Sequence, residues 1–283
     1  MRFALLLLLV LLSARAWGGT LTLTPAVVPN GGAALLRWEG ERPSLAVARF
    51  NGEIVFLRPT ALGSQALLGV DLEAAPGEYP LVVAIADSRG KTEVRRLALQ
   101  VESAQLPEER LFLPPAQVSP RNPQVVERIA RERQMLSDLF ALQDTPAIWE
   151  GFSLPVTDPL SSPFGLRRIL NGKPRSPHSG VDFRSPRGTP VRAPSRGRTV
   201  LASDLFYTGR TVILDHGAGL FSLYGHLETL LCEPGQLLEG GQALGLVGSS
   251  GRSTGPHLHW GIKLRGNRID PMALVDLFAG ENP

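Results

Sequence analysis

The chain has 283 residues, of which 43% are hydrophobic and 19% are charged, and its formal net charge is +3. This composition excludes an intrinsically disordered protein and leaves enough apolar surface for one or two packed cores. The long apolar run from Phe3 to Leu12 falls short of the roughly 20 residues that a spanning helix needs, which excludes a multi-span membrane protein.

The N-terminal segment predicts export. Arg2 precedes the apolar run, and Ala14-Arg15-Ala16 follows it with the A-x-A pattern of a cleavage site. We therefore expect residues 1–16 to be a signal peptide, no membrane span after its removal, and a location in the periplasm, with secretion as the alternative. A retained short anchor is the other interpretation of this segment. The single Cys232 agrees with export, because one cysteine cannot form an internal disulfide, and we expect it to be buried.

Residues 17–102 are expected to form an immunoglobulin-like β-sandwich. Asn51-Gly52 separates two apolar runs, which is the strongest short-range signal for a hairpin. Residues 79–86 read as a strand, and apolar residues alternate over 97–101. Strands at about ten-residue spacing are typical of such sandwiches. No motif in this region carries recognisable chemistry, which favours a spacer or binding module.

Residues 103–145 are predicted to form a Pro-rich linker followed by a helix. Five prolines fall between residues 103 and 123. Asn122 and Pro123 have the residue types of an N-cap and a first helical position, and apolar residues then recur at helical spacing to about Gln143. We expect this amphipathic helix to pack on a domain, with partner binding as the alternative. Residues 146–283 are rich in glycine, proline and short β-type runs, which predicts an all-β domain with little helix.

The histidines all lie in the last 106 residues, at His178, His216, His226, His257 and His259. Because His257 and His259 are two apart, they share one face of a strand. His178 and Asp182 would lie about 13 Å apart on a straight strand, so the chain must bend between them, as Gly180 permits. Two imidazoles and a carboxylate make a three-ligand zinc site with an open fourth position, the pattern of catalytic zinc. The remaining histidines are then acid/base candidates.

The motifs around these residues resemble a known family. In chain order the matching stretches are Ser162–Arg168, Pro177–Phe183, Gly188–Val191, Tyr224–Leu227 and Ser253–Trp260. Together they resemble the M23 family of zinc metallopeptidases, the lysostaphin and LytM-type cell-wall endopeptidases, over roughly residues 160–272. HxxxD, YxHL and TGPHLH in this order are a specific combination, whereas any one of them alone is weak.

The resemblance implies a set of roles. It implies one zinc ion per chain, held by His178, Asp182 and His259. It implies that His226 and His257 are the catalytic residues, which flank the attacking water and the developing oxyanion. The implied substrate is a peptide cross-link between peptidoglycan stems, at the D-Ala–diaminopimelate bond. A Gly-Gly bridge and protein substrates are the alternatives.

Other functions fit the sequence less well. A non-catalytic LytM-type binding protein that activates a cell-wall amidase usually lacks ligands, whereas this chain keeps every family position. Residues 233–245 are similar to biotinyl and lipoyl carriers, but Lys173 and Lys263 are poorly placed for a carrier lysine at a hairpin tip. Metal storage does not require the YxHL motif, and export without a basic helix argues against nucleic acid as a partner. His216 is expected to be structural.

Overall fold

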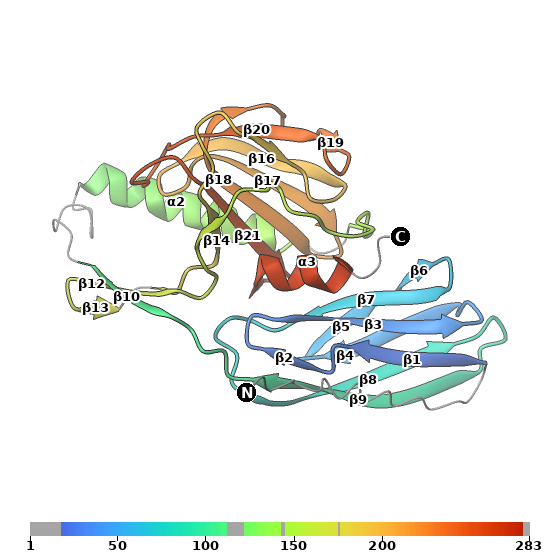
Figure 1. Cartoon of the computed structure of the whole chain (residues 1–283). Helices are drawn as coiled ribbons and strands as arrows, with labels where there is room; N and C mark the ends of the chain where they lie inside the picture. The colour runs from blue at the N-terminus through green and yellow to red at the C-terminus, as the bar shows by residue number, and fades with distance from the viewer. Residues whose placement is uncertain (1–17, 112–121, 143–144, 175, 280–283) are drawn as a thin grey trace, which may run out of the picture. The chain divides into compact units, whose positions relative to one another are not determined.

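The computed structural model describes residues 18–111, 122–142, 145–174 and 176–279, and its regular structure is mostly β, as predicted (Figure 1). The described residues form two compact units, residues 18–68 with 75–103 and residues 69–74 with 104–279. The predicted signal peptide lies outside the described residues. In the part of the chain that is described, no helix has the length and apolar character needed to cross a membrane.

The first unit is a pair of β-sheets. Its strands are β1 (Gly19–Thr24), β2 (Val27–Pro29), β3 (Ala33–Gly40), β4 (Leu45–Phe50), β5 (Glu53–Phe56), β6 (Arg58–Thr60), β7 (Gly63–Gly69), β8 (Gly77–Ala86) and β9 (Thr92–Glu102). One sheet has the order β1-β3-β7-β6 and the other β2-β9-β8-β4-β5. Side chains alternate between buried and less buried along β8, where Leu81, Val83 and Ile85 are fully buried. The two sheets bury their apolar faces as a sandwich requires; the immunoglobulin-like assignment stays a prediction.

The predicted hairpin at Asn51-Gly52 is confirmed. These residues join β4 to β5, and both have positive φ angles, 47° and 83°. A two-residue turn with positive φ at both positions matches the right-handed twist of the flanking strands, which explains the preference for Asn-Gly.

The predicted helix is also confirmed. Helix α2 spans Pro123–Phe140, and the Asn122 side chain accepts a hydrogen bond from the Gln124 N–H at 2.9 Å. Its apolar face, from Leu136, Leu139 and Phe140, packs on a cluster in the second unit. The linker prediction was incomplete, because strand β10 (Glu108–Leu111) lies within it and pairs in parallel with β12 (Arg167–Leu170). The rest of the linker is partly outside the described residues.

The second unit is built on one large sheet. Its further strands are β11 (Leu160–Ser162), β12 (Arg167–Leu170), β13 (Lys173–Pro174), β14 (Gly180–Phe183), β15 (Pro190–Arg192), β16 (Gly197–Leu205), β17 (Gly209–Gly217), β18 (Leu220–Leu230), β19 (Leu237–Leu238), β20 (Ala243–Val247), β21 (Leu258–Leu264) and β22 (Asn267–Ile269). The main path of the sheet is β11-β14-β21-β18-β17-β16-β19. β17 and most of β18 are buried along their length, and both carry buried polar side chains among their apolar residues.

The expectation of little helix at the C-terminus overlooked α3 (Pro271–Ala279). The Asp270 carboxylate accepts a hydrogen bond from the Met272 N–H at 2.9 Å, and Pro271 opens the helix. These are ordinary helix-start signals, and Leu274 and Phe278 are buried on its inner side.

Strand β21 has a central position that determines the site. It pairs antiparallel with β14 on one side and with β18 on the other (Figure 1). Its His259 lies opposite Asp182 of β14 and opposite Gly225 of β18. Residues that are far apart in the sequence therefore meet at one position across three adjacent strands.

Candidate metal centre

The sheet register brings the three predicted ligands together. His178 lies just before β14, Asp182 lies on it, and His259 lies directly opposite Asp182 on β21. The His259 Nδ1 lies 2.9 Å from Asp182 Oδ1, and the His178 Nε2 lies 3.1 Å from the same oxygen. The two imidazole nitrogens are 3.0 Å apart. All three ligand atoms lie within reach of a single ion.

Gly180 allows the HxxxD segment to bend against β21, as predicted. A Cβ at this position would lie 2.3 Å from the Trp260 carbonyl oxygen and 2.9 Å from His259 Cε1. The first of these contacts is to backbone and cannot be relieved by a side-chain movement. A residue other than glycine would therefore push β14 away from β21 and separate the ligands.

Hydrogen bonds outside the cluster orient His178. Its Nδ1 lies 3.0 Å from the Pro163 carbonyl oxygen, which can only accept, so Nδ1 carries the hydrogen. Nε2 is left as the nitrogen that faces Asp182. Metal-binding histidines commonly use this arrangement, in which a backbone carbonyl fixes the tautomer.

The cluster is arranged to keep its carboxylate ionised and an imidazole neutral. Burial alone would raise the pKa of Asp182, but its close contacts with His178 and His259 outweigh this effect and hold the pKa well below its usual range. Burial lowers the pKa of His259, with a smaller opposing contribution from Asp182. Metal ligands must be deprotonated in this way, because a protonated nitrogen has no lone pair to give.

The two predicted catalytic histidines lie beside this cluster. The ring centroids of His226 and His257 are 4.6 Å apart, and those of His226 and His259 are 6.2 Å apart. His226 Nδ1 donates to the Ser250 carbonyl at 2.8 Å, and His257 Nδ1 donates to the Gly255 carbonyl at 2.9 Å. Both rings therefore keep Nε2 as an acceptor. Burial lowers the pKa of His226 to about 4, and the neighbouring histidines add to this effect.

His226 lies at an irregularity in β18. Its φ angle is +62°, in the left-handed region that non-glycine residues seldom adopt. The β17–β18 register shifts here, because Arg210 pairs with Leu227 whereas Val212 pairs with Tyr224. Such bulges re-aim a side chain beside an active site.

His216 lies outside the centre, in the second unit's core. It is fully buried, with Nδ1 2.7 Å from the Arg196 carbonyl oxygen and Nε2 2.7 Å from Ser222 Oγ. Ser222 Oγ also lies 2.7 Å from the Tyr224 hydroxyl. Both ring nitrogens of His216 are thus used in internal hydrogen bonds. Cys232 is buried, as expected.

Sequence reasoning missed the groups that orient the histidines. The acceptors from Pro163, Ser250 and Gly255 are backbone carbonyls, which every residue carries, so residue type gives no signal for them. Ser250 has a weak signal, as a hydroxyl residue in the Gly- and Ser-rich segment before TGPHLH.

The donor set fits zinc. Two imidazole nitrogens and one carboxylate oxygen are common zinc ligands, at about 2.0–2.2 Å, and three protein ligands leave a position for substrate or water. Two additional imidazoles next to such a centre supply groups for proton transfer. Fold and site together define a metallohydrolase.

Comparisons with known proteins identify the family. Residues 176–271 match peptidase family M23. A solved structure from Pseudomonas aeruginosa assigned to peptidase M23 aligns with a TM-score of 0.67 and 30% identity, over 88% of this chain and 95% of that one. The chain belongs to peptidase family M23, which confirms the predicted resemblance. Zinc is the metal of this family, which agrees with the donor set and confirms the predicted cofactor.

Relatives with assigned names match a part of the chain. DD-carboxypeptidase/endopeptidase Mpg of Neisseria meningitidis serogroup B is 37% identical over 116 residues, which are 41% of this chain and 27% of that protein. Peptidoglycan DD-endopeptidase ShyA of Vibrio cholerae is 40% identical over 114 residues, 40% of this chain and 26% of that protein. The chain thus matches about a quarter of the length of these relatives.

Proposed function

We propose that this protein is a zinc-dependent endopeptidase that hydrolyses peptide cross-links of peptidoglycan. The observation that carries the proposal is the meeting of His178, Asp182 and His259 within reach of one ion, with the imidazoles of His226 and His257 beside them. The matched relatives that are named as peptidoglycan DD-endopeptidases support the substrate.

The roles follow from the contacts of each side chain. His178, Asp182 and His259 would hold the zinc. When bound, zinc is a Lewis acid that polarises a carbonyl and makes water acidic enough to attack near neutral pH. Between them, His226 and His257 accept the proton of the attacking water at Nε2. The Nε2–H formed in this way can donate to the oxyanion and then pass the proton to the leaving amine. Their Nε2 atoms are suited to this because each Nδ1 hydrogen is already committed to a backbone carbonyl.

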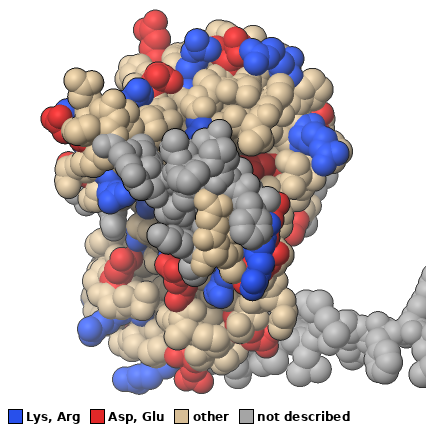
Figure 2. Space-filling model, turned by 90° about the vertical axis from the view of Figure 1, so that its left-hand side faces the viewer, with Lys and Arg blue, Asp and Glu red and all other residues tan. Residues whose placement is uncertain are grey.

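The proposed bond is D-Ala–diaminopimelate. The names of the relatives contain "DD", which agrees with a bond between D-configured centres. Basic and acidic side chains are interspersed over the face drawn in Figure 2, which agrees with a peptide substrate better than with a polyanion such as nucleic acid.

We also propose export to the periplasm with loss of residues 1–16. The motivation is the tripartite start of the sequence, and a peptidoglycan substrate agrees with it. N-terminal sequencing of protein from the native host should begin at Trp17. Recovery of intact Met1 in the membrane fraction would contradict this proposal.

The test is digestion of purified diaminopimelate-type sacculi by the full-length zinc protein, with products identified by mass. Cross-linked dimers should give monomeric stems with a new free amine on diaminopimelate. Asp182→Asn serves as the inactive control. A zinc-loaded protein that leaves every cross-linked wall intact but stimulates a cell-wall amidase would overturn the proposal in favour of a binding role.

A further inference from the structure

A hairpin loop contacts the backbone of His226 from one side. Strands β16 and β17 are joined by Phe206, Tyr207 and Thr208. The Thr208 carbonyl accepts the His226 N–H at 2.6 Å, and the Tyr207 carbonyl accepts the Arg252 N–H at 2.9 Å. The loop therefore contacts both the bulge that carries His226 and the segment that carries the Ser250 carbonyl.

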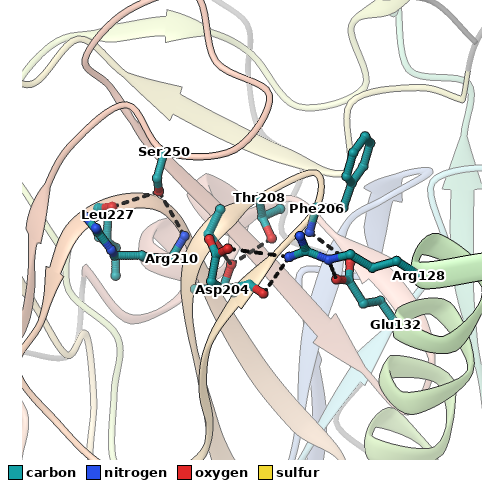
Figure 3. Close-up of polar contacts among 10 residues, drawn as sticks. Arg128, Glu132, Asp204, Phe206, Thr208, Arg210, Leu227 and Ser250 are labelled. Carbon is teal, nitrogen blue, oxygen red and sulfur yellow. Dashed lines mark hydrogen bonds and ion pairs between the residues drawn. The ribbon is translucent and has the colours of Figure 1, made fainter. Parts of the chain in front are cut away.

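The other side of the same loop is held by helix α2, as Figure 3 shows. Glu132 Oε2 accepts the Phe206 N–H at 2.8 Å, and Arg128 donates to the Asp204 carbonyl at 2.9 Å. Arg128 also donates to Glu132 Oε1 at 2.6 Å, so the two helix residues support one another. The two shorter contacts are to backbone groups, and Arg128 also contacts the Asp204 carboxylate at 3.4 Å.

Helix α2 is itself anchored by apolar packing. Leu136, Leu139 and Phe140 lie one to two turns beyond Glu132 and contact the cluster formed by Leu201, Leu205, Ile213 and Phe221. The rings of Phe140 and Phe221 meet edge to face, with centroids 5.4 Å apart. Glu132 and Arg128 thus project from a fixed helix.

His226 needs external support because of its conformation. A left-handed backbone at a non-glycine residue costs free energy and persists only where the surroundings hold it. The surroundings are the Thr208 carbonyl on the amide and the Ser250 carbonyl on the ring. Ser250 is held in turn, since its hydroxyl donates to the Leu227 carbonyl and accepts the Arg210 N–H, each at 2.8 Å (Figure 3).

We propose that Glu132 and Arg128 are positioning residues for His226: by fixing the 206–208 loop, they keep the Thr208 carbonyl where it holds His226 in its left-handed conformation. This inference rests on the catalytic role proposed for His226. It gives helix α2 a part in the reaction although neither residue touches the metal ligands. Glu132 and Arg128 take no part in proton transfer themselves and only position the His226 imidazole.

The test compares Glu132→Ala and Glu132→Gln in the full-length zinc protein. Glu132→Ala removes the acceptor for Phe206, and a small displacement of a catalytic group lowers kcat by about 10- to 10²-fold, with KM and zinc content unchanged. Amide hydrogen exchange at His226 should become faster. Glu132→Gln keeps an acceptor oxygen and should recover most of the rate. Arg131→Ala is the matched control, because this exposed residue on α2 pairs with its helix neighbour Glu127, and the change should leave both readouts unchanged.

A double-mutant cycle separates positioning from general damage. In a His226→Ala background, Glu132→Ala should have almost no further effect on kcat, because the group that it positions is gone. An equal fold-loss in both backgrounds, or unchanged exchange at His226, would overturn the inference. A zinc-loaded His226→Ala protein with full activity would instead overturn the proposed role of His226, while the exchange measurement would still decide whether α2 holds the loop.

Discussion

The two units use their buried positions differently. Among the described residues, the first unit buries two polar side chains, Ser64 and Gln65. The second unit buries Ser162, Asp182, Ser185, Ser195, Thr199, Thr211, Asp215, His216, Ser222 and His226. A buried polar group costs free energy unless it is hydrogen-bonded. Within this set Asp182 and His226 belong to the metal centre, whereas His216 and Ser222 contact one another in the core. The comparison teaches that both units are packed on apolar residues and that the second unit also buries polar groups of its centre.

The largest expected effect comes from the ligands. His178→Ala and Asp182→Asn should lose both zinc and turnover, because two remaining ligands leave a poor coordination shell. Elemental analysis should show the zinc content falling from one per chain towards zero, with no measurable cleavage. A variant that kept both would show that the metal is held elsewhere.

A core substitution in the first unit should lower its stability and leave zinc content and turnover unchanged, the reverse of a ligand substitution. Leu81 is fully buried in β8, and Leu81→Ala should lower the free energy of unfolding of that unit by about 2–5 kcal/mol. Zinc content and turnover per folded molecule should be unchanged. Chemical denaturation followed alongside zinc content checks this. Loss of zinc in this variant would contradict the comparison, because it would mean that the metal centre depends on the first unit.

A smaller effect concerns pH. Burial lowers the pKa of His216 to about 4, below its ordinary value of 6.5, so the unfolded chain binds this proton more readily than the folded one. The contribution of His216 to the free energy of unfolding is fully present above about pH 6.5 and is lost as the pH falls towards 4. The total loss amounts to about 3 kcal/mol. Unfolding free energies of wild type and His216→Asn, measured between pH 7 and 4, should differ in slope over this window. Parallel curves would contradict the assignment.

His216→Asn should also remain an active enzyme at neutral pH. Its ring contacts Arg196 and Ser222 and none of the ligands in the described structure, so its loss should lower stability rather than kcat. Cleavage of a cross-linked peptide at a temperature well below unfolding is the measurement. A loss of kcat with intact folding and zinc would move His216 into the catalytic set.

The sequence predicted the features that depend on local chemistry. Asn51-Gly52 and Asn122-Pro123 specify a turn and a helix start through their own backbone preferences. The HxxxD and HxH motifs contain the three side chains that the structure brings together, and their roles as zinc ligands stay a prediction. Strand β10 was missed because its partner, β12, lies more than fifty residues away. Helix α3 was missed although Asp270-Pro271 is a start signal, because the surrounding β-type runs dominated the interpretation.

The supporting groups of the site could not be predicted in the same way. The bulge at His226 depends on a carbonyl from the 206–208 loop, and that loop depends on a helix some seventy residues earlier. These are backbone contacts set by tertiary packing, and no residue pattern at His226 indicates them. Sequence therefore identifies the reacting groups better than the groups that position them.

The central claim is that the histidines of the centre divide into ligands and proton-transferring residues. The direct measurement is zinc content together with turnover for His226→Ala, beside His178→Ala. His226→Ala should keep close to one zinc per chain while kcat falls by about 10²-fold or more, because a proton acceptor or oxyanion donor is lost. His257→Ala should behave similarly, with some loss of zinc because it lies two residues from His259. A His226→Ala protein that lost zinc as fully as His178→Ala would contradict the division.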